Sequence, residues 1–242
     1  MAKHPSSPFT DEQLAARFTS FHPQPHSQTQ YMERPQRAMT LGIVLLILNA
    51  VGVAGFSMEA WKPLFALLTP FNLLLTNILL GLFHRVWSRR FAFWALLTAL
   101  AGWLVEVAGV QTGLIFGEYA YLDVLGFKPG GAPLLIGVNW LMLVYVAGVL
   151  CSRIKASWWL QAAAGASLMT LLDVIMEPVA IRLEFWTWFG QHPPLQNYIA
   201  WWLIAFVLLI GFYQLPQRPH NRFAVWVLAS QILFFGGLWL LG

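Results

Sequence analysis

Hydrophobic residues come in long, continuous blocks along this chain. Their approximate bounds are residues 38–57, 63–83, 91–110, 132–150, 157–180, 197–215 and 222–241. Each block is long enough to cross roughly 30 Å of hydrocarbon as a helix, at about 1.5 Å per residue. The alternation of polar and apolar residues that is typical of membrane β-barrels is missing. The pattern therefore predicts an all-α integral membrane protein, a bundle of about seven transmembrane helices.

Composition supports this interpretation. Hydrophobic residues make up 58% of the 242 residues and charged residues only 10%, whereas soluble domains carry about 25% charged residues. The formal net charge is +4, but the basic residues stand singly or in pairs between the apolar blocks. This placement argues against a nucleic-acid partner and for a lipid bilayer as the surroundings.

The basic residues also predict an orientation. One side of the membrane would carry Arg34, Arg37, Arg85, Arg89, Arg90, Arg153, Lys155, Arg218 and Arg222, and the other only Lys62, Lys128 and Arg182. Because basic residues concentrate on the cytoplasmic side, we expect a cytoplasmic N-terminus and an extracytoplasmic C-terminus. Two long connections, residues 111–131 and 181–196, would then lie outside.

The first residues differ in character from the rest. Residues 1–37 are rich in Pro, Gln, His and Ser and lack the apolar core of a signal peptide. We expect a disordered or surface-associated polar tail here. Residues 38–242 show no internal repeat and no second domain, so we expect a single transmembrane helical domain.

Three acidic residues lie within the apolar blocks. Glu106 is in the third block, and Asp173 and Glu177 are in the fifth, four residues apart and therefore on one helix face. An acid inside a membrane span is unfavourable by a few kcal/mol or more, which makes it a functional candidate. The structural alternative is that Glu177 ends a helix before Pro178 and that Glu106 is a neutral interhelical hydrogen-bond partner.

These polar groups are predicted to share one layer of the membrane. Counting along the helices places Glu106 and Asp173 roughly 6–10 Å below the outer boundary. Asn139 reaches a similar depth, and Gln196 and Asn197 begin the sixth block at the same face. We therefore expect a site close to the extracytoplasmic side.

Two stretches, residues 106–145 and 173–197, resemble a known family. The matching elements are Glu106, Thr112-Gly113, Phe116-Gly117, Tyr119, Tyr121, Gly126, Pro133, Asn139-Trp140, Tyr145, Asp173, Glu177-Pro178, Trp186, Trp188, Pro194 and Gln196-Asn197. They resemble the integral-membrane carotenoid biosynthesis proteins that hydrate an acyclic end group, which include bisanhydrobacterioruberin hydratases and γ-carotene 1′,2′-hydratases. One departure is Glu177-Pro178, where the family is expected to have Asp-Pro.

The resemblance implies a carotenoid 1,2-hydratase, which adds water across a terminal C1=C2 double bond without a redox cofactor. Because the sequence has no metal-ligand spacing, we expect no metal site. Such a reaction needs a proton donor, a positioned water and stabilisation of a tertiary carbocation. Our hypothesis is that Asp173 or Glu106 is the general acid and that Glu177, Asn139 or Gln196 holds the water. Candidate substrate-binding residues are Asn139, Trp140, Tyr119, Tyr121, Trp186, Trp188, Gln196 and Asn197, whose aromatic members could stabilise a cation.

The resemblance also implies partners and a location. The substrate would be a carotenoid dissolved in the bilayer, and other carotenoid biosynthesis enzymes are candidate partners. The expected location is a prokaryotic cell membrane, crossed several times.

The sequence leaves alternative functions open. A lycopene-type cyclase also begins by protonating a terminal alkene, and a carotenoid-binding or transport protein would not catalyse any reaction. A retinal protein needs a lysine within the membrane, but Lys3, Lys62, Lys128 and Lys155 all lie outside the blocks. Neither an Asp-rich prenyltransferase motif nor a metal-ligand spacing is present.

Overall fold

The computed structural model describes residues 26–216 and 218–242. The chain divides into two compact units, Met1–Arg37 and Ala38–Gly242. Residues 26–37 of the predicted polar tail are helical and form the start of α2 (His26–Phe56). Residues 1–25 lie outside the described residues, so disorder there stays a prediction.

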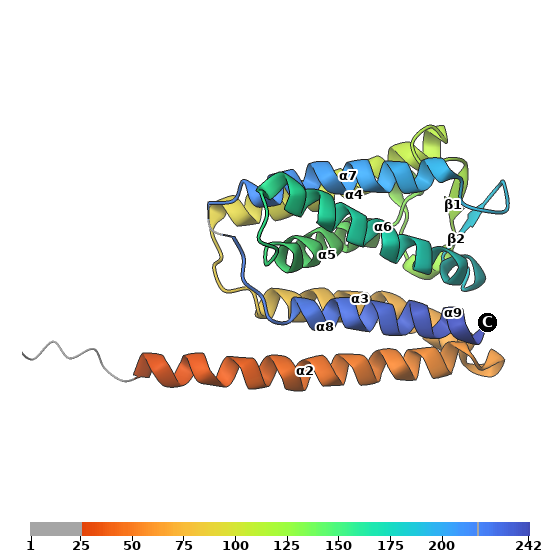
Figure 1. Cartoon of the computed structure of the whole chain (residues 1–242). Coiled ribbons are helices and arrows are strands. Elements are labelled where there is room, and N and C mark those ends of the chain that lie inside the picture. Colours follow the sequence, from red (N-terminus) through yellow and green to blue (C-terminus); the bar gives the residue numbers. More distant parts are fainter. Residues whose placement is uncertain (1–25, 217) are drawn as a thin grey trace, which may run out of the picture. The chain divides into compact units, whose positions relative to one another are not determined.

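Helices account for most of the described chain (Figure 1). They are α2 His26–Phe56, η1 Glu59–Trp61, α3 Lys62–Leu82, α4 Arg89–Thr112, η2 Asp123–Leu125, η3 Pro129–Gly131, α5 Leu134–Cys151, α6 Trp158–Arg182, α7 Leu195–Tyr213, α8 Ala224–Gln231, the π-helical turn η4 Ile232–Gly236, and α9 Gly237–Leu241. Among the described residues, seven helical segments are long and apolar enough to cross a membrane. They coincide with the seven predicted blocks, so the predicted architecture is confirmed, while its orientation stays a prediction.

Local sequence explains where several helices begin and end. The Ser88 hydroxyl accepts a hydrogen bond from the Phe91 amide, which caps the start of α4. Gly113 ends α4 with a φ of 66°, a left-handed conformation that glycine adopts without strain. Pro133 and Pro194 directly precede α5 and α7. The long connections therefore begin and end at defined residues.

Helix α5 lies at the centre of the membrane-spanning unit. It packs against α3, α4, α6, α7 and α8. Of its membrane-spanning stretch 72% is buried, compared with 11% for the second span. Most α5 side chains therefore contact other helices, whereas the second span exposes most of its apolar residues on the surface where lipid is expected. This central position lets α5 contribute residues to a site between the helices.

Small residues allow α4 and α5 to approach closely. A Cβ atom on Gly137 would lie 2.4 Å from the Ala99 carbonyl oxygen, and one on Gly102 would lie 2.4 Å from the Trp140 Cβ. Close backbone approach at small residues is a common way to pack membrane helices. The contact fixes Trp140 against α4, where Glu106 also lies.

We expect Gly137→Ala to destabilise the protein by about 1–3 kcal/mol, because the backbone carbonyl of Ala99 cannot move aside without shifting α4. Thermal unfolding in detergent measures the effect. Gly190→Ala is the matched control, since a Cβ there meets no atom within 4 Å. Equal stability of the two variants would contradict this account of the α4–α5 contact.

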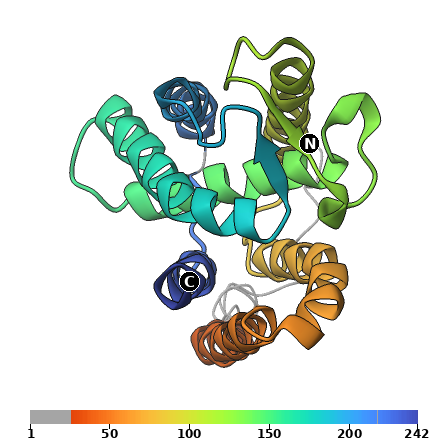
Figure 2. The ribbon, with the colours of Figure 1, turned by 90° about the vertical axis from the view of Figure 1, so that its right-hand side faces the viewer.

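The two long connections pair with each other, a feature that the hydrophobic pattern did not predict. Strand β1 (Tyr119–Tyr121) pairs antiparallel with β2 (Trp186–Trp188), with Tyr119 opposite Trp188 and Tyr121 opposite Trp186. The strands lie together at one end of the helices in Figure 1, and this end faces the viewer in Figure 2. The short sheet therefore joins the segment after α4 to the segment after α6.

Candidate functional site

The β1–β2 sheet presents four aromatic side chains on one face. In a strand, residues two apart point to the same side, so Tyr119 and Tyr121 of β1 stand beside Trp188 and Trp186 of β2. All four side chains are buried. The ring centroids lie 5.1 Å apart for Tyr119 and Trp188 and 5.9 Å apart for Tyr121 and Trp186. Each strand thereby directs two hydrogen-bond donors towards the helices.

The tyrosines of β1 donate to Glu106 of α4. Both hydroxyls reach Glu106 Oε2, at 2.6 Å from Tyr119 and 2.8 Å from Tyr121. The other carboxyl oxygen, Oε1, accepts a hydrogen bond of 2.9 Å from Trp140 Nε1 on α5. Glu106 is 3% exposed, and both of its oxygens are occupied. Its carboxyl group is therefore held by three donors from two different elements.

The tyrosine hydroxyls remain protonated donors. Burial raises the pKa of Tyr119 and Tyr121 well above the usual value, and the nearby Glu106 carboxyl raises both further. A neutral phenol can donate to a carboxyl oxygen without adding charge to the site. These residues are therefore suited to fix Glu106 and not to exchange protons with it near neutral pH.

The tryptophans of β2 donate to Glu177 of α6. Trp186 Nε1 and Trp188 Nε1 both reach Glu177 Oε2, at 3.0 and 2.9 Å. The second oxygen, Oε1, has no hydrogen-bond partner among the described residues. Glu177 also lines the cavity described below. One oxygen is therefore anchored while the other is available to a ligand.

Asp173 lies one helical turn before Glu177 on the same face of α6. Its Oδ2 accepts a hydrogen bond of 3.0 Å from Asn197 Nδ2 on α7, and its Oδ1 is buried without a partner among the described residues. Asn197 lines the cavity but Asp173 does not. Asp173 therefore lies behind the cavity wall, close to Glu177.

No described cationic side chain forms an ion pair with any of the three acids. Among the described residues, the ion pairs are Lys62–Glu59 and Lys128–Asp123, both outside the site. Several uncompensated negative charges in one buried site would be very unfavourable. The arrangement therefore favours a site that holds at least one proton.

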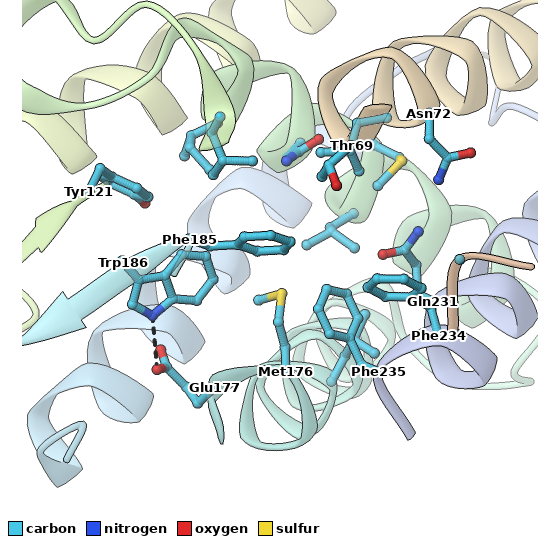
Figure 3. A pocket seen from close by; sticks show the side chains of 18 of the residues that line it. Thr69, Asn72, Tyr121, Met176, Glu177, Phe185, Trp186, Gln231, Phe234 and Phe235 are labelled. Carbon is cyan, nitrogen blue, oxygen red and sulfur yellow. Dashed lines mark hydrogen bonds between the residues drawn. The ribbon is translucent and has the colours of Figure 1, made fainter. Parts of the chain in front are cut away.

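These groups surround a cavity of about 320 Å³ between the helices. Figure 3 shows Tyr121, Trp186 and Glu177 at one end, the apolar side chains of Phe185 and Met176 between, and polar side chains at the other end. The volume falls in the range of small-molecule sites, about 300–1,000 Å³, and the walls are mostly apolar. Such a cavity suits an apolar ligand with one reactive end.

Partly exposed lining residues of α2 and α3 indicate that the cavity opens to the surface between these helices. Its lining includes Leu48 and Val51 of α2 and Leu68 of α3, which are 42%, 51% and 44% exposed. These side chains belong to helices with the length and composition of membrane spans. An apolar ligand could therefore enter sideways from the lipid.

Most of the predicted site residues line this cavity. They are Glu106, Tyr119, Tyr121, Asn139, Trp140, Glu177, Trp186, Trp188 and Asn197. Asn139 Oδ1 is buried without a hydrogen-bond partner among the described residues. The structure thus brings together residues from the third, fourth, fifth and sixth blocks, as expected from their depth.

Gln196 is placed differently from the other candidates. It is exposed and is not part of the cavity lining. Its side-chain amide donates to the backbone carbonyls of Leu114 and Ile115. Gln196 therefore links the start of α7 to the connection after α4.

Several cavity residues were not predicted from the sequence. Trp201 stacks on Trp140 with ring centroids 4.4 Å apart, and its spacing of four from Asn197 could have indicated a shared helix face. Phe185 directly precedes β2. Gln231, Phe234 and Phe235 come from the last span, where no charged residue marks the site-facing side.

The described residues contain no group of three or more His, Cys, Asp or Glu side chains placed to hold a metal ion. His192, the histidine nearest to Asp173 and Glu177 in the sequence, is exposed in the connection before α7. The polar chemistry of the site therefore comes from carboxyl, amide, hydroxyl and indole groups.

Comparisons with known proteins agree with the resemblance. The carotenoid biosynthesis protein family matches residues 61–241. A bisanhydrobacterioruberin hydratase from Haloarcula japonica is 27% identical over 215 residues, which cover 82% of this chain and 72% of that protein. No solved structure matches. The family match spans most of the chain, including all three acids and both strands, and this protein therefore belongs to the carotenoid biosynthesis protein family.

Proposed function

We propose that this protein adds water across the terminal C1=C2 double bond of an acyclic carotenoid. The observation that carries the proposal is the free Oε1 of Glu177, which lies in an apolar, aromatic cavity that an apolar ligand can enter from the lipid. Membership of the carotenoid biosynthesis family supports the substrate class, and the similarity to a hydratase supports the reaction.

The first step would be proton transfer from Glu177 to the alkene. Oε1 gives its proton to C2, the π electrons form the new C–H bond, and a tertiary cation remains at C1. Trp186 and Trp188 hold the other oxygen, so the carboxyl group keeps a fixed direction during the transfer. A positioned general acid of this kind contributes about 10²–10⁴-fold to the rate.

Aromatic faces would stabilise the cation. The rings of Trp140, Trp201 and Tyr119 line the cavity beside the carboxyl groups. Each cation–π contact is worth about 0.5–2 kcal/mol, with the larger values in desolvated sites. The cluster could therefore lower the barrier without attacking the cation.

Water would then complete the reaction. Asn139 Oδ1 has no partner among the described residues and lines the cavity, so it can accept a hydrogen bond from water. The water oxygen bonds to C1, and the proton that it loses returns to the Glu177 carboxylate. Atoms and charges balance, and the acid is restored for the next cycle.

The sequence suggested Asp173 or Glu106 as the general acid and Glu177 as a residue that holds the water. In the proposed mechanism the role of general acid passes to Glu177. Glu106 has both oxygens occupied by donors, so we assign it to positioning and to the negative potential of the site. Asp173 does not line the cavity, and we assign it to holding Asn197 and supporting the proton on Glu177. Glu177 takes the part of the general acid.

The bilayer would supply the substrate. The exposed, apolar cavity mouth at Leu48, Val51 and Leu68 opens where lipid is expected to contact the protein. We propose a multi-pass position in a prokaryotic cell membrane, in reach of the enzymes that make the substrate and consume the product.

Expression in a lycopene-accumulating host tests the proposal. We expect a new pigment that is heavier than its precursor by one water molecule, because hydration adds a hydroxyl group to C1 and a hydrogen atom to C2. Mass spectrometry of extracted pigments measures this change, with an empty vector as the control.

The same experiment separates the alternatives. A cyclase would give a pigment of unchanged mass with altered retention and absorption. A binding or transport protein would leave the pigment chemically unchanged. Either result, obtained with protein present in the membrane, would contradict hydration of this substrate.

A further inference from the structure

The same cavity has a second polar end, which the proposed reaction does not use. Figure 3 shows Thr69, Asn72 and Gln231 at this end, separated from Glu177 by Met176, Phe234 and other apolar side chains. The residues come from α3 and α8, whereas the carboxyl groups come from α4 and α6. The cavity thus offers hydrogen bonds at two separate places.

The amide groups at this end are incompletely satisfied. Gln231 is 6% exposed, yet its side chain makes no hydrogen bond among the described residues. Asn72, which is half-buried, makes none through its side chain either. Asn49 donates to the Leu45 carbonyl of its own helix and keeps its oxygen free. A buried amide without partners is unfavourable by about 1–3 kcal/mol unless a ligand or water binds it.

A distortion of the last span accompanies these residues. The π-helical turn η4 begins at Ile232, directly after Gln231, and contains Phe234 and Phe235, which line the cavity together with Gln231. A π-turn widens the helix by one residue and changes the direction of the side chains around it. Such turns are rare and occur frequently at functional sites.

The chemistry of this end points to a neutral oxygen group. Amides both donate and accept, which suits a hydroxyl or a carbonyl oxygen. None of the cavity-lining residues at this end carries a charge, so an anionic headgroup would find no counter-charge. The surrounding walls are apolar, so the rest of the ligand must be hydrocarbon.

We propose that Gln231, Asn72 and Asn49 form a subsite for an oxygen substituent on the carotenoid chain, so that the protein prefers a substrate that already carries a hydroxyl or keto group. This inference rests on the proposed function for the class of ligand. It adds a second recognition point, which fixes how far the chain enters before its terminal double bond meets Glu177.

Binding measurements test the subsite without requiring turnover. The probes are lycopene and a derivative that carries one hydroxyl group away from both terminal double bonds. The protein is held in nanodiscs, and quenching of tryptophan fluorescence gives the dissociation constants. We expect the wild-type protein to bind the hydroxylated probe about tenfold more tightly, the factor expected for one or two buried hydrogen bonds.

Gln231→Leu should abolish the preference for the hydroxylated probe. Asn72→Leu, at a less buried position, should reduce this preference. The Asn72 variant provides the test if the Gln231 variant does not fold. Asn77→Leu is the matched control, because Asn77 bonds to Leu73 and Met142 and does not line the cavity. It should keep the preference.

Three results would overturn the subsite. The first is a wild-type protein that binds both probes equally well, and the second is a preference that survives in both Gln231→Leu and Asn72→Leu. The third is an equal loss of affinity for the two probes in these variants, which would mean that the amides bind water and not the substituent. Because Glu177→Gln should still bind with the wild-type preference, failure of hydration and failure of the subsite give different results.

Discussion

Glu177→Gln should lower the rate of carotenoid hydration by about 10²–10⁴-fold, the contribution of a positioned general acid. The amide has nearly the same shape as the carboxyl group, and its oxygen can still accept from Trp186 and Trp188. It cannot release a proton to an alkene. Product formation in isolated membranes with added lycopene, normalised to the amount of protein, measures the loss.

Two further variants make this result specific. Glu118→Gln, at the exposed residue that directly precedes β1, should retain the wild-type rate. Asp173→Asn keeps a group that can bond to Asn197 and should reduce the rate less than Glu177→Gln does. Full activity of Glu177→Gln together with an inactive Asp173→Asn would assign the proton to Asp173, which the sequence suggested as one of two candidates beside Glu106.

Hydrophobic patterning predicted the helices because lipid imposes a strict requirement on each span. A membrane-crossing segment must be apolar along its whole length, so its bounds can be read from the sequence without knowledge of its neighbours. The depth of Glu106, Asp173 and Asn139 follows from the same requirement, since position along a helix gives position across the membrane.

The β1–β2 pairing could not be predicted in the same way. Three-residue strands have no local stability of their own, and the pairing depends on contacts between segments far apart in the chain. The alternating aromatics in Tyr119–Tyr121 and Trp186–Trp188 were a usable signal, because alternation places both side chains on one face. Which acid each strand would bind depended on the helix packing.

Tertiary contacts also decide which of the two acids on α6 lines the cavity. Asp173 and Glu177 share a helix face, and the sequence could not distinguish which of them reaches the cavity. Packing against α7 turns Asp173 towards Asn197, whereas β2 draws Glu177 towards the cavity. Tertiary contacts therefore selected one carboxyl group from two that are equivalent by spacing.

Glu106→Leu should lower the free energy of unfolding by several kcal/mol. The substitution leaves Tyr119, Tyr121 and Trp140 as buried donors without their acceptor, and each such donor costs about 1–3 kcal/mol. Thermal unfolding in detergent, followed by size-exclusion chromatography, measures the effect. Glu59→Gln, which breaks the exposed pair with Lys62, should change stability by no more than about 1 kcal/mol.

A combined variant separates the lost hydrogen bonds from the lost carboxyl group. Adding Tyr119→Phe and Tyr121→Phe to Glu106→Leu removes two of the three stranded donors, so stability should partly recover. Each tyrosine substitution alone should destabilise the protein, because it removes a donor from a satisfied carboxyl oxygen. Opposite effects of the tyrosine substitutions on stability, with and without Glu106, would indicate that the tyrosines and Glu106 are directly coupled. Additive losses would instead mean that Glu106 stabilises the fold independently of the strand that covers it.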